Sequence, residues 1–287
     1  MNRFGILCAA GLLAGGVLLS AQSTAIPAPR RGAGDSVTGA FEGWYYNEDG
    51  SRSFLVGYYN RNSQQTLDIP IGPNNRIEPG GPDMGQPTHF LPGRQWGMFT
   101  VNVPKDFKPT DSYTWTIVAN GQSMSIPLRL KADYVMSPFT EIAVGNTPPA
   151  VRFEANGKAF QGPLATLATA FSLSGSVSQP LALHVWMTDD MKFTSGTNAP
   201  PSGARAPVAV RWSKYRGPGA VTFDKARPEL EKTSGPAPFN GKADATAKFA
   251  EPGDYVLHLT ANDYSGDGGG GFGCCWTTSL VKVSVKP

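Results

Sequence analysis

The sequence contains little charge, few histidines and few cysteines. Of its 287 residues, 16% are charged, three are His and three are Cys. It contains no Gly-x-Ser-x-Gly, no phosphate-cradling Gly-Lys-Ser/Thr loop, no His-Glu-x-x-His and no Cys-x-x-Cys. So few histidines leave little room for a hydrolase that depends on His or on a metal. A glycosidase that uses a carboxylate pair stays open, because acidic residues are numerous and their spacing is uninformative without a fold. Whether the chain is an enzyme is therefore undecided, and the sequence favours that it is not.

Long apolar helical periodicities are also absent after the N-terminus. Instead, short alternating runs are separated by Gly, Pro and Asn, and the chain holds 34 Gly and 25 Pro. This pattern is typical of an all-β protein. The length is sufficient for two domains of roughly 100–150 residues each. We predict an all-β fold with two β-sandwich domains.

The first 25 residues have the pattern of a secretion signal. Asn2 and Arg3 give a positive start, Ile6–Leu19 is apolar, and Ser23–Ala25 offers a small-residue cleavage site. The alternative is a membrane anchor, for which the apolar run is short and rich in Gly and Ala. We expect a secreted protein (extracellular, periplasmic or on the cell surface) that meets the membrane only through this signal. Residues 26–37 are expected to be a flexible lead-in.

The charge balance bears on the partners. Loss of Arg3 with the signal lowers the formal net charge from +3 to +2. A nearly neutral chain argues against nucleic acid or anionic lipid as the main partner. The expected partner is an extracellular or surface ligand, either a protein or a polysaccharide.

Residues 38–145 predict an N-terminal β-sandwich or barrel. Two hairpins are expected, around Asp49-Gly50 and around Asn120-Gly121. A long Pro/Gly-rich loop over residues 72–93 lies between them, and loops of this length are usually functional or disordered. The candidate ligand-binding residues here are Asp83, His89 and Trp96, although His89 has no catalytic partner at a telling spacing.

Aromatic residues are concentrated in this domain. They would either fill its core or, if exposed, stack on sugar rings. The residues concerned are Trp44, Tyr45, Tyr46, Tyr58, Tyr59, Trp96 and Trp115.

Residues 146–287 predict an immunoglobulin-like domain. Its strands 181–188 and 255–261 alternate with period two, and a final strand covers 280–285. The segments Val210–Phe223 and Ala247–Asp263 resemble the polycystic-kidney-disease-type (PKD) immunoglobulin-like repeats of bacterial secreted proteins, with a core Trp, a Gly-Pro-Gly turn and a Pro-Gly-x-Tyr lead-in. The whole chain also resembles a group of uncharacterised bacterial secreted proteins. The resemblance implies a binding, spacing or adhesion module, and a fold alone does not fix a function.

Acidic residues follow two of these strands. In an immunoglobulin-like sandwich the loops after the second and sixth strands emerge at the same end. We therefore expect oxygen ligands to gather there and to suit Ca²⁺ as a cofactor. The alternative is that they cap turns. The candidate metal ligands are Asp189, Asp190, Asn262, Asp263 and Asp267.

Two adjacent cysteines, Cys274 and Cys275, remain once Cys8 leaves with the signal. Adjacent Cα atoms lie closer than in an ordinary disulfide, so a bond between them forms a tight ring. The alternatives are a bridge to another chain, or two thiols for metal or redox chemistry. His184 and His258 are out of phase with their strands' core residues and are expected to face outward on opposite sheets.

The sequence thus predicts a secreted or cell-surface protein with a non-catalytic binding, adhesion or assembly role. Its working surface is expected at the aspartate-rich end of the second domain, stabilised by calcium, with the 72–93 loop leaning over it. One alternative is a carbohydrate-binding protein that uses aromatics of the first domain. Another is a secreted metal or redox protein that uses the two cysteines.

Overall fold

The computed structural model describes residues 31–142, 144–163, 165–192, 206–264 and 274–287. Over these residues the chain is built from strands, and the only helical element there is one 3₁₀ turn, η1 (Ala132–Tyr134). The predicted all-β class is therefore confirmed. No helix in the described ranges has the length and hydrophobicity needed to cross a membrane. The predicted signal peptide falls outside them.

The first domain consists of two main sheets around an aromatic core. One sheet has the order β1 (Val37–Tyr46), β2 (Arg52–Asn60) and β6 (Gly93–Val103). The other has the order β4 (Asn75–Glu78), β7 (Tyr113–Ala119) and β8 (Gln122–Leu128). A short pair is formed by β3 (Leu67–Asp68) and β5 (His89–Phe90). Both predicted hairpins are present, as β1–β2 and β7–β8. The second is closed by Asn120 and Gly121, both at positive φ (49° and 75°), which is the backbone that a two-residue hairpin turn needs.

The second domain is a sandwich of two sheets. One sheet has the order β10 (Phe171–Ser176), β17 (Trp276–Lys286), β16 (Gly253–Asn262) and β12 (Ala209–Arg216). The other has the order β13 (Val221–Phe223), β15 (Phe239–Phe249), β11 (Leu181–Asp189) and β9 (Ala150–Arg152). The short strand β14 (Glu231–Lys232) also pairs with β15. Their inner faces enclose a core that contains the buried Trp212, the core tryptophan that the PKD-type resemblance implied.

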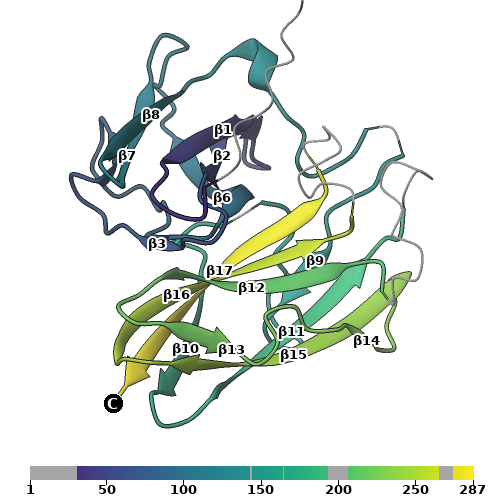
Figure 1. Cartoon of the computed structure of the whole chain (residues 1–287). Coiled ribbons are helices and arrows are strands. Elements are labelled where there is room, and N and C mark those ends of the chain that lie inside the picture. The colour runs from purple at the N-terminus through teal and green to yellow at the C-terminus, as the bar shows by residue number, and fades with distance from the viewer. Residues whose placement is uncertain (1–30, 143, 164, 193–205, 265–273) are drawn as a thin grey trace, which may run out of the picture.

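The two domains lie against each other (Figure 1), and apolar residues of both belong to one core cluster. Residues of β16 alternate, so Leu257 and Leu259 enter the sandwich core while Val256 and His258 face the first domain. Val256, Tyr215 of β12 and Leu280 of β17 belong to the core cluster of the first domain. The sheet β10-β17-β16-β12 is therefore covered on both faces along these strands. His258 faces outward from the sandwich, as expected, but the first domain covers that face and buries the side chain.

Candidate functional site

Two of the predicted aspartates lie inside the open end of the second sandwich. Asp189 follows Val185 and Met187 in the inward phase of β11, and Asp263 follows Leu259 and Ala261 in the inward phase of β16. Both carboxyl groups are consequently buried, with exposed fractions of 5% and 6%. We call them, with Asn146, the aspartate rim.

Asn146 lies in the segment between the domains and is hydrogen-bonded to one member of the aspartate rim, Asp263. Its Nδ2 donates a hydrogen bond to Asp263 Oδ2 at 2.7 Å. Asp189 Oδ1 accepts a bond from the Met191 amide at 2.8 Å, whereas its buried Oδ2 has no hydrogen-bond partner among the described residues. Burial raises the pKa of Asp189 to about 7, and the charges of Asp263 and Asp190 add to the effect while the Met191 bond opposes it. Protonation of Asp189 relieves its repulsion with the Asp263 carboxylate.

The other predicted metal ligands diverge from the aspartate rim, because neighbouring residues of a strand point to opposite faces. Asp190 accepts bonds from the Thr147 amide (3.1 Å) and hydroxyl (2.9 Å). Asn262 lies on the face of β16 that carries His258 and Thr260 and lines a pocket with them. Asp267 lies outside the described residues. Within those residues, no group of three or more His, Cys, Asp or Glu side chains is placed to hold a metal ion.

The same residues do show turn chemistry. Oδ1 of Asp189, Asp190 and Asn262 each accepts a bond from the amide two residues later in the chain. This is the Asx-turn, which ends strands without any ligand. Calcium at this end of the domain stays a prediction.

Cys274 and Cys275 lie beside the aspartate rim. They precede β17, whose first residue, Trp276, pairs with Asn262 at the end of β16. Both cysteines are buried, the peptide bond between them is cis, and their Cα atoms lie 3.2 Å apart. A disulfide between the two stays a prediction. Cys275 Sγ lies 3.4 Å from the Asn146 carbonyl oxygen. The paired sulfurs and the two inward aspartates thus share one end of the domain.

The 72–93 loop leans on the second domain at a different place. Asp83 accepts two bonds from the Arg216 guanidinium, at 2.8 and 2.9 Å, and the Thr88 amide donates to the Tyr215 carbonyl at 3.2 Å. Arg216 ends β12, whose other end at Ala209 pairs with Asn262. The expectation that the loop leans over the aspartate-rich end is therefore wrong. In the described structure, Asp83 therefore forms an ion pair that joins the first domain to the second.

His89 is the second candidate from this loop. Its Nδ1 lies 2.8 Å from Asp68 Oδ1, which also accepts a bond from Lys214 Nζ at 3.1 Å. Burial is the main cause that lowers the pKa of His89, and the charge of Lys214 adds to it, while Asp68 opposes both. The polar contact across the domain boundary is therefore made by Asp68, and His89 binds Asp68 from within the first domain.

Most of the aromatic candidates are in the core. Trp44, Tyr45, Tyr58 and Trp115 are buried, while Tyr46 and Trp96 are exposed by 59% and 39%. The Trp44 and Tyr46 rings meet edge to face at an angle of 65°, so they do not form a flat stacking platform. The Arg94 guanidinium stacks on the Trp96 ring at 3.8 Å.

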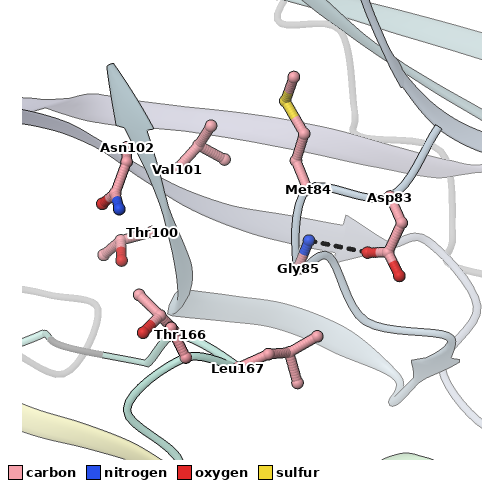
Figure 2. A pocket seen from close by; sticks show the side chains of 9 residues that line it. Asp83, Met84, Gly85, Thr100, Val101, Asn102, Thr166 and Leu167 are labelled. Atoms are coloured by element: carbon pink, nitrogen blue, oxygen red, sulfur yellow. Dashed lines mark hydrogen bonds between the residues drawn. The ribbon is translucent and has the colours of Figure 1, made fainter. Parts of the chain in front are cut away.

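One hollow at the domain boundary is a groove that the sequence did not predict. Two cavities of about 670 and 480 Å³ share Thr100, Asn102, Thr166 and Ala168, so they form one interdomain groove. Figure 2 shows one half of it, with Thr100 to Asn102 of β6 on one side, the Asp83–Gly85 turn on another, and Thr166 and Leu167 below.

The other half of the groove passes the β1–β2 turn. Its lining residues are mostly neutral and polar, and they are Asn47, Ser51, Ser53, Thr100, Asn102, Gln161, Thr166 and Thr169, with Glu48, Asp49 and Lys158 as the charged ones. Two rings, Tyr45 and Phe139, meet edge to face at 5.4 Å and complete the lining. Tyr45 is buried and donates to the Pro163 carbonyl at 3.2 Å. Burial raises the pKa of Tyr45 to about 12, so its hydroxyl stays neutral.

Comparisons with known proteins identify no family. No family model matches the chain, and no curated protein matches it either, so the PKD-type resemblance has no such support. Among solved structures, the chain is similar to domains 4 and 5 of the S-layer protein SbsC (10% identity, TM-score 0.22, 88% of this chain and 98% of that chain covered). It is also similar to the D00-D0 domain of intimin (12%, 0.24, 87% and 97%) and to a protein of unknown function from Porphyromonas gingivalis W83 (8%, 0.22, 87% and 100%). At TM-scores this low, no function is transferred from any of them.

Proposed function

We propose that this chain is an exported, non-catalytic binding protein of the cell surface, and that it holds a neutral polysaccharide chain in the interdomain groove. The observation that carries the proposal is the groove itself, long, open and lined by hydroxyl and amide side chains from both domains. The aspartate rim is a weaker candidate for ligand contact, because its described side chains are buried.

The lining matches the chemistry of sugars. Hydroxyl and amide groups both donate and accept hydrogen bonds, as sugar hydroxyls do, and neutral groups are less costly to desolvate than charges. Phe139 is half-buried, so part of its ring offers an apolar surface. Polysaccharides are extended, and a groove that is open along its length suits them better than a closed pocket does.

The shared interface supports a rigid groove. One wall comes from the first domain and the other from residues 158–169, and Ala165 packs in the first-domain core beside the Thr100 amide, which donates to its carbonyl at 3.3 Å. A groove that is already formed before binding avoids part of the entropy cost of ordering it.

The test uses three neutral hexasaccharides, namely cellohexaose, chitohexaose and mannohexaose. Each is titrated into the processed protein by isothermal calorimetry, with Asn102→Ala as the groove variant and Asn74→Ala as the matched control. Asn102 is exposed in the groove, and Asn74 is exposed in the 72–75 turn outside it.

We expect at least one hexasaccharide to bind. Loss of one or two hydrogen bonds in Asn102→Ala should weaken binding about three- to tenfold, while Asn74→Ala leaves it unchanged. Binding that both variants weaken equally, or binding that neither weakens, would place the ligand elsewhere. Absence of binding at millimolar concentrations of all three would refute the proposal.

A further inference from the structure

A second, smaller pocket lies along the same strand, β6, on the side of the aspartate rim. It is a cavity of about 100 Å³ between β6 and the outward faces of β12 and β16. Arg94, Trp96 and Met98 line it from the first domain, and Arg211, Ser213, Arg227, His258, Thr260 and Asn262 are among the residues that line it from the second. We call it the arginine pocket.

The described lining of the arginine pocket is rich in positively charged side chains. Three of its lining residues are arginines, and none of the described lining residues is Asp or Glu. Arg94 is paired with Glu42 at 2.9 Å, which offsets the charge of Arg94. Arg211 Nη1 donates a hydrogen bond at 3.3 Å to Oε1 of Gln95, a neutral residue of the first domain that also lines the pocket. The remaining lining groups, including the neutral His258, supply no negative charge: burial, followed by the charge of Arg211, lowers the pKa of His258 to about 3.

A buried donor in this pocket lacks an acceptor. Asn262 is exposed by only 5%, and its Oδ1 accepts a bond from the Tyr264 amide at 2.6 Å, which fixes the orientation of the amide group. Its Nδ2 has no hydrogen-bond partner among the described residues. An unsatisfied buried donor costs about 1–3 kcal/mol, so an acceptor at this place stabilises the site.

We propose that the arginine pocket binds one oxyanion group through Arg211, Arg227 and Asn262 Nδ2. Guanidinium groups pair with carboxylate, sulfate and phosphate through parallel hydrogen bonds, and the amide adds a further donor. The cavity is smaller than the roughly 150 Å³ cavity that holds a benzene ring, so it fits one such group and not a whole sugar ring. Trp96, partly exposed in the same lining, offers an aromatic surface beside the anion.

The group has two sources, a free inorganic anion or an acidic group carried on a saccharide. The probes are therefore sodium sulfate, sodium phosphate and sodium glucuronate, added to the processed protein at constant ionic strength in sodium chloride. Thermal unfolding gives a saturable shift of the midpoint, and isothermal calorimetry gives the dissociation constant. The variants are Arg227→Gln, whose side chain is exposed, and Arg211→Gln. The matched control is Arg129→Gln, an exposed arginine outside the pocket.

We expect at least one probe to raise the unfolding midpoint saturably beyond sodium chloride alone, and Arg227→Gln to weaken its binding about fivefold or more. Arg129→Gln should bind as the unaltered protein does. Glucuronate binding without the inorganic ions identifies an acidic sugar as the source, and the reverse identifies a free anion. The proposal is overturned if no probe binds, or if Arg129→Gln loses as much affinity as Arg227→Gln. Should Arg211→Gln fail to fold, Arg227→Gln decides alone.

Discussion

The substitution Asp189→Asn tests the electrostatics of the aspartate rim. Asn has nearly the same shape as Asp and no charge, so the change removes the titration and leaves the packing. The pKa of Asp189 is raised from 3.8 to about 7 in the folded protein, with burial as the main cause. A difference of about three pH units, at 1.36 kcal/mol per unit, corresponds to about 4 kcal/mol as an upper bound.

The sign follows from proton binding. Between pH 3.8 and about 7 the unfolded chain has lost the Asp189 proton while the folded protein keeps it. The folded protein therefore loses stability as pH rises through this range, and the loss levels off above it. His258 has the opposite effect, because its pKa is lowered from 6.5 to about 3 and its contribution grows as pH rises between these values. The pH profile of the unaltered protein alone therefore cannot isolate Asp189.

The informative quantity is the difference between the two proteins. Urea unfolding, measured from pH 4 to pH 8, gives the free energy of unfolding of each. The advantage of Asp189→Asn should grow with pH up to about 7, by as much as about 4 kcal/mol, and then stay constant. Asp254→Asn, on an exposed position of β16, is the control and should show no such growth. A difference that is flat over the whole range, or that shrinks as pH rises, would refute the reasoning.

Four further predictions concern the interface and the aspartate-rich end. Tyr215→Ala removes a fully buried ring from the shared core and should lower the free energy of unfolding in urea by about 3–5 kcal/mol. Arg216→Ala breaks a partly exposed ion pair and should lower it by about 1 kcal/mol. Equal losses would contradict the shared core. The free energy of unfolding of the unaltered protein, minus that of His258→Gln, should increase as pH rises from 3 to 6.5, and a flat difference would show that His258 makes no such contribution. If the predicted signal is removed and the predicted disulfide joins Cys274 to Cys275, alkylation of the denatured, unreduced protein should add no mass, and an added mass would reveal thiols. If the predicted calcium site exists, added Ca²⁺ should raise the midpoint of thermal unfolding, and this rise should disappear in Asp263→Ala. A rise that persists in the variant would place the ion elsewhere.

Local patterns in the sequence were sufficient for the fold class and the hairpins. Alternation in β11 and β16 places Val185 and Leu257 in the core, and the Asn120-Gly121 pair predicts its turn, because each signal acts between near neighbours. The same alternation, continued past the ends of the two strands, would have placed Asp189 and Asp263 on the inward face and Asp190 and Asn262 on the opposite face.

The interface was not predictable from such patterns. Tyr215, Val256 and Leu280 lie on the outward face of their sheet, which looks like a solvent face until a second domain covers it. The interdomain groove depends on the same docking, since Asn102 and Thr166 come from different domains. An outward row with large apolar residues such as Tyr215 and Val256 was the one available signal of a covered face.

Hydrogen–deuterium exchange of the processed protein, with and without a hexasaccharide that binds, tests the central claim most directly. The account predicts slower exchange in the segments that form both walls of the interdomain groove, residues 47–53, 100–102 and 158–169. Slower exchange at only one wall, or only around the exposed ring of Tyr46, would contradict a binding site that both domains build.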